Sequence, residues 1–148
     1  MPAGLEMGPQ LSGTVRTERG LFLPVNQWSG EARTFSVYAN DASGWREVSG
    51  GPVNSREGRS QGAIDPVGRG VWATWSEFLP GGDGTIRIRA AEVGPDGREF
   101  TRRVTLHEGG PIGPGFTQAV EFEGNPVFGY MRNIDGKVKA TVDFSLAD

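Results

Sequence analysis

Residues 59–106 have the sequence RSQGAIDPVGRGVWATWSEFLPGGDGTIRIRAAEVGPDGREFTRRVTL. Four runs rich in Val, Ile, Thr, Trp and Phe cover residues 62–65, 70–78, 85–92 and 99–106. Such residues suit a pleated, half-buried surface, whereas the Pro and Gly residues between the runs favour turns. The pattern therefore predicts four short strands in an antiparallel meander.

Two further stretches of the chain repeat this module. The repeats start at Gln10, Gln61 and Gln118, about 50 to 57 residues apart, and each contains a third strand with alternating apolar residues. The alternating residues are Phe35, Val37 and Ala39, then Ile86, Ile88 and Ala90, then Val138, Ala140 and Val142. Self-similarity with this period is typical of blade-like repeats. We therefore expect an all-β fold of three four-stranded antiparallel meanders, of which the last lacks its fourth strand.

Length and composition agree with this interpretation. The chain has 148 residues, with 24 Gly, 10 Pro, 4 Trp and 8 Phe. A chain of this length can bury a real core, and Gly and Pro at turn spacing favour a turn-rich β protein over disorder. We expect a single domain over residues 1–148, with repeats at about 10–58, 59–113 and 114–148. The alternative is an ordinary β-sandwich, because antiparallel sandwiches alternate in the same way.

Charge and composition disfavour several classes of function. The net charge of −3 gives no long-range attraction for nucleic acid, and no apolar run approaches the roughly 20 residues that span a bilayer. The chain has no Cys and a single His, His107, so disulfides and a His-based zinc site are not expected. No spacing implies a metal, nucleotide or redox cofactor. The start shows no secretory signal, which predicts a cytoplasmic protein or a component of a larger particle.

A resemblance to a known family rests on the second repeat. The relevant residues are Gln61, the strand GVWATWSE at 70–77, the strand TIRIRA at 85–90, Asp96-Gly97 and Phe100. This succession resembles a blade of the sialidase-type β-propellers with BNR repeats. The ending with Gly44-Trp45 and Gly50-Gly51 also resembles blades of propeller lectins. The family's Asp-box, Ser-x-Asp-x-Gly-x-x-Trp, is degenerate here, because residues 39–45 lack the Ser and displace the Gly and the Trp.

The resemblance implies a further chain. A propeller needs about four to eight blades to close its ring, and an open arc of three would leave apolar sheet faces in water. Closed dimers are the commonest oligomers. We therefore expect two chains to form a six-bladed propeller, with residues 5–7 of the same or the partner chain supplying the missing strand.

Candidate ligand-binding residues follow from the positions that recur between repeats. Polar residues follow the aromatic second strands, and two Arg residues share one face of a third strand. The candidates are Gln27, Trp28, Trp72, Glu77, Arg87, Arg89, Tyr130 and Asn133. Flat aromatic faces with planar polar groups suit sugars, so we expect a non-enzymatic, carbohydrate-binding protein. Trp72 and Trp75 have an alternative place in the core between blades, which is favoured for Trp75, whereas Trp28 is expected to be exposed.

Two other functions stay open. A sialidase-like hydrolase would need an Arg cluster, a Tyr nucleophile with a Glu base and an acidic proton donor. Residues of these types are Arg33, Arg87, Arg89, Arg132, Tyr130, Glu121, Glu77 and Asp65. Because the family's motifs are incomplete, we expect no catalytic residue. The other alternative is a virion-type structural protein with a β-sandwich fold and residues 1–13 and 109–115 as arms.

Overall fold

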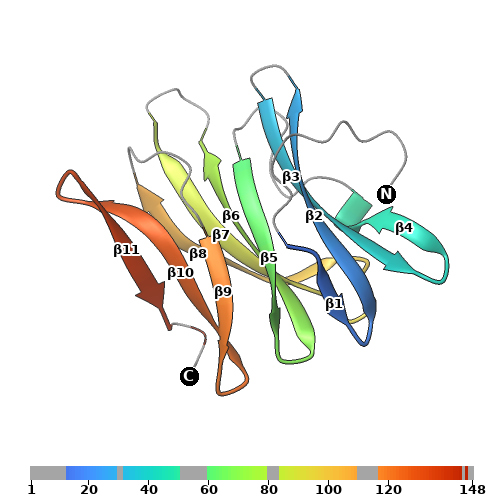
Figure 1. The fold of residues 1–148 in the computed structure, drawn as a ribbon. Helices are drawn as coiled ribbons and strands as arrows, with labels where there is room; N and C mark the ends of the chain where they lie inside the picture. The colour runs from blue at the N-terminus through green and yellow to red at the C-terminus, as the bar shows by residue number, and fades with distance from the viewer. Residues whose placement is uncertain are drawn as a thin grey trace.

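The computed structural model describes residues 13–29, 32–50, 60–79, 84–109, 117–144 and 146. They form three antiparallel sheets that stand side by side (Figure 1). Sheet A contains β1 (Val15–Thr17), β2 (Gly20–Ser29), β3 (Ala32–Asp41) and β4 (Gly44–Glu47), followed by the 3-10 turn η1 (Val48–Gly50). Sheet B contains β5 (Ser60–Val67), β6 (Gly70–Phe78), β7 (Ile86–Val93) and β8 (Phe100–Gly109). Sheet C contains β9 (Thr117–Phe122), β10 (Asn125–Ile134) and β11 (Lys137–Asp143).

The predicted all-β architecture of successive meanders is confirmed. Strands follow one another in chain order within every sheet, and sheet C has three strands where the others have four. The strand predicted at 70–78 coincides with β6, whereas β8 continues three residues beyond the predicted end at 106. The sheets do not close into a barrel within the described ranges. Gln10, residues 5–7 and most of the two expected arms lie outside the described residues.

Each sheet turns the same set of positions toward the next sheet along the chain. We call this side of a sheet its leading face and the opposite side its trailing face. Side chains alternate between the two faces of a strand, so Phe35, Val37 and Ala39 of β3 share the leading face of sheet A. The corresponding residues of β7, Ile86 and Ile88, lie on the leading face of sheet B.

A hydrophobic core fills the space between sheets A and B. Phe35 and Val37 pack against Val71, Ala73 and Trp75 on the trailing face of sheet B. The indole of Trp75 is fully buried, and its ring centroid lies 6.4 Å from that of Phe35. The core position expected for Trp75 is therefore confirmed.

A second core fills the space between sheets B and C. Ile86, Ile88 and Trp72 pack against Phe128 and Tyr130 of β10. Trp72 is only 1% exposed and meets Phe128 edge-on, with ring centroids 5.3 Å apart. Side chains on the two faces of β6 thus belong to two different cores. This explains why nearly all of this strand is apolar or buried.

Sheets A and B meet through two hydrogen bonds made by one buried side chain. The side chain of Asn26, which is buried in β2, donates from Nδ2 to the Gly62 carbonyl at 3.0 Å and accepts from the Gly62 N–H at 2.9 Å. β5 is the edge strand of sheet B, so the Asn26 amide takes the place of a neighbouring strand at this residue. Only Gly fits there, because a Cβ on Gly62 would lie 2.4 Å from the ring of Phe35.

A hydrogen bond between a side chain and the backbone of an edge strand also joins sheets B and C. β9 is the edge strand of sheet C, and its Ala119 N–H donates to Oδ2 of Asp65 in β5 at 2.8 Å. The Glu121 carboxylate of β9 accepts from the N–H of Gly68, in the turn after β5, also at 2.8 Å. Side chains therefore satisfy edge amides at both junctions.

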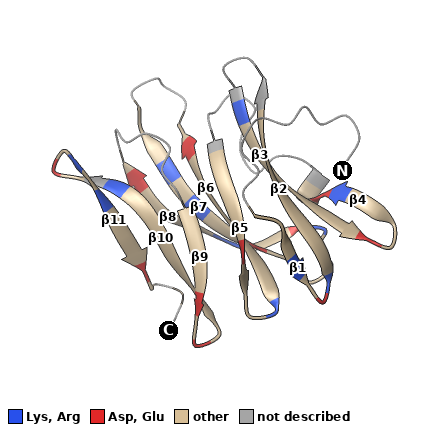
Figure 2. Cartoon of the chain, viewed as in Figure 1, with Lys and Arg blue, Asp and Glu red and all other residues tan. Residues whose placement is uncertain are grey.

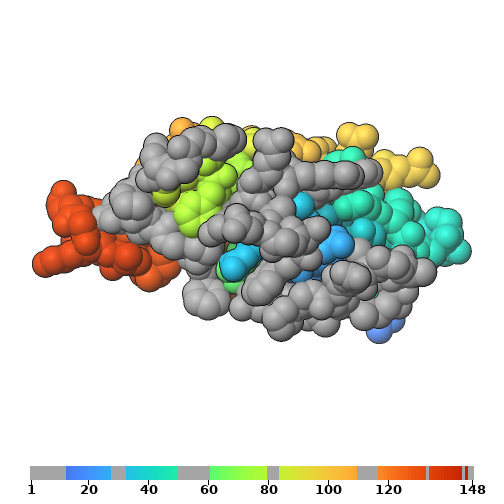
Figure 3. Space-filling view, turned by 90° about the horizontal axis from the view of Figure 1, so that it is seen from above, coloured from blue at the N-terminus to red at the C-terminus, as the bar shows by residue number. Residues whose placement is uncertain are grey.

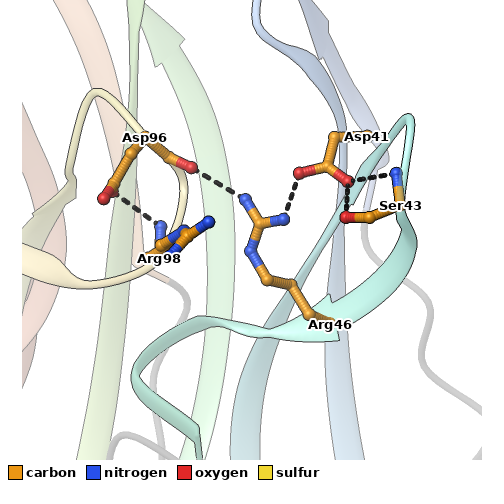
Figure 4. Close-up of polar contacts among 5 residues, drawn as sticks. All are labelled: Asp41, Ser43, Arg46, Asp96 and Arg98. Carbon is orange, nitrogen blue, oxygen red and sulfur yellow. Dashed lines mark hydrogen bonds and ion pairs between the residues drawn. The ribbon is translucent and has the colours of Figure 1, made fainter.

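A third link joins sheet A to the loop between β7 and β8 (Figure 4). The Arg46 guanidinium of β4 binds the carboxylate of Asp41 and donates to the Asp96 carbonyl at 2.7 Å. Gly97, next in this loop, has a φ of +66° and packs against Ala39. A left-handed residue at this point favours Gly, which matches the Asp-Gly turn expected from the sequence.

We predict that Asn26→Ala destabilises the fold by about 2–4 kcal/mol, because it removes both hydrogen bonds that Asn26 makes to the buried backbone of Gly62. Urea unfolding measures this change. Gln27→Ala is the matched control on the same strand, and its cost should stay within about 0.5 kcal/mol. Asn26→Asp should also be destabilising, because it places a second oxygen against the Gly62 carbonyl. Equal costs for Asn26→Ala and Gln27→Ala would contradict the role of this contact.

Candidate functional site

The three second strands end at one edge of the molecule. In Figure 1, β2, β6 and β10 all point to the upper edge of the row of sheets. Gln27, Glu77 and Asn133 lie within two residues of the ends of these strands. The structure therefore places the predicted polar positions of the three repeats along a common edge.

Charged residues from three neighbouring strands line up on sheet B at this edge. Glu77 of β6 is opposite Arg87 of β7, and Arg87 is opposite Glu108 of β8. Arg87 Nε donates to Glu108 Oε2 at 2.9 Å, and Arg87 Nη1 lies 3.8 Å from Glu77 Oε1. We call these three residues the charged ladder. In Figure 2 the acidic ends of β6 and β8 flank the basic segment of β7.

Arg89 and Trp75 form the next rung on the same face. The two residues are register partners, and the guanidinium carbon of Arg89 lies 5.8 Å from the centre of the Trp75 ring. A guanidinium at this distance is attracted to the face of an indole. Trp75 therefore holds Arg89 in place beside the ladder while its own ring stays buried.

The charged side chains of the ladder and Arg89 lie in a partly buried environment. Burial raises the pKa of Glu77 above its usual value of 4.5, although the Arg89 and Arg87 guanidinium groups lower that pKa. Glu77 is the most buried of the three ladder side chains and Glu108 the most exposed. The formal charges of these two acids and two bases cancel, so the site presents donors and acceptors with no net charge.

The other predicted residues do not join the ladder. The structure corrects the prediction that Trp72 binds a ligand. Trp72 lies in the core between sheets B and C, with no ring face open to a ligand, because both faces of β6 are covered. Gln27 lies in β2 on sheet A and is half-buried. Trp28 and Asn133 belong to β2 and β10, and their side chains lie outside what the structure describes.

Tyr130 is held inside the junction between sheets B and C. Its hydroxyl lies 3.4 Å from the Leu106 carbonyl and 3.3 Å from Oδ2 of Asp143, and its ring stacks on His107. Burial and the nearby Asp143 raise the pKa of Tyr130, which opposes formation of a phenolate nucleophile.

The residue types of a sialidase-like site are also divided between two sides of sheet B. Arg87 and Arg89 lie on its trailing face, whereas Tyr130 belongs to the core on its leading face. Within the described ranges, a single chain therefore does not bring this Arg pair to the Tyr.

A shallow hollow of about 440 Å³ lies over sheet C and the adjoining part of β5. It is lined by Ala63, Asp65, Thr117, Gln118, Gly129, Tyr130, Met131, Ala140, Thr141 and Val142. Burial raises the pKa of Asp65, although the Ala119 N–H that binds this carboxylate lowers it. The Asp65 carboxylate already binds the Ala119 N–H at the junction between sheets B and C. Its main role is therefore structural.

Sequence reasoning missed Glu108, Asn26 and the structural role of Asp65. Glu108 lies beyond the predicted end of β8, because irregular register between β7 and β8 near Arg89 lengthens the paired strand. A buried Asn in a strand of apolar residues was the available signal for Asn26.

Comparison of the chain with family models, curated proteins and solved structures found no match. The described residues contain no group of three His, Cys, Asp or Glu side chains placed to bind a metal ion. In the same part of the chain, no helix has the length and apolar character needed to cross a bilayer.

We predict that Glu77→Gln becomes more stable relative to wild type as the pH rises above 4.5, the usual value for Glu. Folding raises the pKa of Glu77, so the folded state binds the proton more tightly and loses stability as pH rises through the window up to that raised pKa. Urea unfolding at several pH values between 4 and 8 measures the difference. Asp96→Asn, in an exposed turn, is the control for removing one carboxylate. A stability difference that stays constant, or that favours wild type at higher pH, would contradict this assignment.

Proposed function

We propose that the chain is a non-enzymatic recognition module that binds carbohydrate at the charged ladder. The observation that carries this proposal is the ladder itself, in which Arg87 is fixed between Glu77 and Glu108 from two other strands. Three strands hold these planar groups, so little conformational freedom is lost when a ligand binds.

The chemistry of the ladder suits sugar hydroxyls. Each carboxylate accepts hydrogen bonds from hydroxyl groups, and the guanidinium groups of Arg87 and Arg89 donate to hydroxyl oxygens. The cancelling formal charges favour a neutral glycan over an acidic one, since an anion would meet Glu77 and Glu108 as well as the two Arg residues. This favours a neutral sugar over the sialic acid that the family resemblance would suggest.

An aromatic platform for the sugar ring remains a prediction. Trp75 is buried under Arg89 and does not serve as one. Trp28 lies near the end of β2, at the same edge of the molecule as the end of β6 (Figure 1). We propose that Trp28 packs against an apolar sugar face while the ladder binds hydroxyls.

We also propose that the three sheets are blades of a propeller-like body that a second chain completes. The support is that equivalent residues of successive repeats lie on equivalent faces, and that the edge strands β5 and β9 both contact the preceding sheet. The closed ring of six blades remains a prediction.

We predict that wild-type protein binds a subset of neutral glycans on a glycan array and that Arg87→Ala weakens this binding about tenfold, the effect of losing one charge-assisted hydrogen-bonding group. Calorimetry with a glycan identified on the array measures the change. Arg102→Ala is the matched control, because Arg102 also pairs with a glutamate of sheet B, Glu92, but away from the ladder. Its affinity should equal that of wild type.

Two results would overturn the proposal. One is an array with no glycan bound by folded protein at millimolar ligand. The other is equal affinity for wild type and Arg87→Ala when circular dichroism shows that both are folded. Turnover of a fluorogenic glycoside that Glu77→Gln abolishes would instead support the hydrolase.

A further inference from the structure

The leading face of sheet C is apolar and open. Five large apolar side chains on or beside it, Val120, Phe122, Val138, Val142 and Phe144, are between 45% and 61% exposed. Register places Val120 beside Val127 and Val142 beside Gly129, so they share one side of the sheet. Sheet C lies at one end of the row of sheets, as its orange-red atoms show in Figure 3. Soluble chains rarely leave a cluster of this kind uncovered.

The repeat indicates what kind of surface covers this face. Val138, Ala140 and Val142 occupy the positions that Phe35, Val37 and Ala39 hold in sheet A. In sheets A and B the residues at these positions are buried against the trailing face of the next β-meander. The leading face of sheet C would extend this series of interfaces. We therefore expect another β-meander to cover it.

The face also lacks charge. None of the β9, β10 and β11 residues that register places on this side is Asp, Glu, Lys or Arg. The opposite side of β11 carries Lys137, Lys139 and Asp143. An uncharged surface can be buried without leaving an unpaired ion, and it needs no partner of opposite charge.

The shape of the face fits a β-surface as well. The hollow over sheet C includes Gly129 and Ala140, so small residues lie next to the exposed Val142. A Cβ added to Gly129 would meet no atom within 4 Å, which leaves room for an apolar side chain of a partner.

We propose that the leading face of sheet C is the surface through which a second copy of this chain binds. The second copy supplies the required β-meander and an uncharged apolar surface, and its own sheet C offers the same face for a two-fold arrangement. Within one chain, the outward face of sheet A already buries Leu23 and Val25, which are 8% and 2% exposed, so the two-fold arrangement of two sheets C is the one we propose. This arrangement buries Val138 and Val142, and it does not depend on glycan binding.

Sedimentation velocity over roughly 1–100 μM protein tests the proposal. We expect a reversible dimer for wild type, a dimer dissociation constant at least about tenfold higher for Val142→Lys and for Val138→Lys, and an unchanged constant for Val142→Ile. Both positions are more than half exposed, so the Lys variants should fold, as thermal unfolding can verify. Thr105→Lys adds the same charge at an exposed position of β8 and should dimerise like wild type.

Cross-linking identifies the contact surface directly, because the chain has no native Cys. A short bis-maleimide should join two Val138→Cys chains, and this product supports the proposal. A folded monomer at the highest concentration without this product would overturn it. So would a dimer that the two Lys variants leave intact.

Discussion

The contact between Asn26 and Gly62 sets how closely the first two sheets approach each other. An edge strand carries backbone groups that need partners, and at Gly62 one buried amide side chain supplies both a donor and an acceptor. The approach is so close that the ring of Phe35 occupies the space where a Cβ of residue 62 would lie. Hydrogen bonding and apolar packing therefore fix the same inter-sheet distance.

This constraint explains how separate sheets become one body. Antiparallel meanders satisfy their backbone groups internally except at their edges, so neighbouring sheets need another reason to stay in register. At both junctions a polar side chain bonds to the first strand of the next sheet, and apolar residues fill the space behind it. Among the described residues, the last sheet has the apolar face but no following sheet, and its exposed valines and phenylalanines are the consequence.

Much of this architecture could be predicted from local sequence. The run GVWATWSEF between two Gly turns predicts β6 to the residue, and alternation places Phe35 and Val37 on one face. The burial of Trp72 could not be read in this way, because a strand covered on both faces loses the alternation that distinguishes core from surface.

The contacts that determine the site depend on register and tertiary approach. Asn26 and Gly62 are 36 residues apart, and no local pattern reports such a pair. Glu108 joins the ladder only because register shifts after Ile88 and Ala90 realign β8 against β7. Glu77, Arg87 and Arg89 were predicted and do meet, since their positions follow from the simple hairpin of β6 and β7.

Hydrogen exchange of the Gly62 amide, followed by NMR, tests the central claim most directly. The Gly62 N–H lies on the edge of sheet B. An amide at this edge that was bonded only to water would exchange about as fast as the amide of the exposed turn residue Gly136. If Asn26 binds this edge, Gly62 should exchange as slowly as the amides of the interior strand β6. Exchange of Gly62 at the rate of Gly136 would contradict the account.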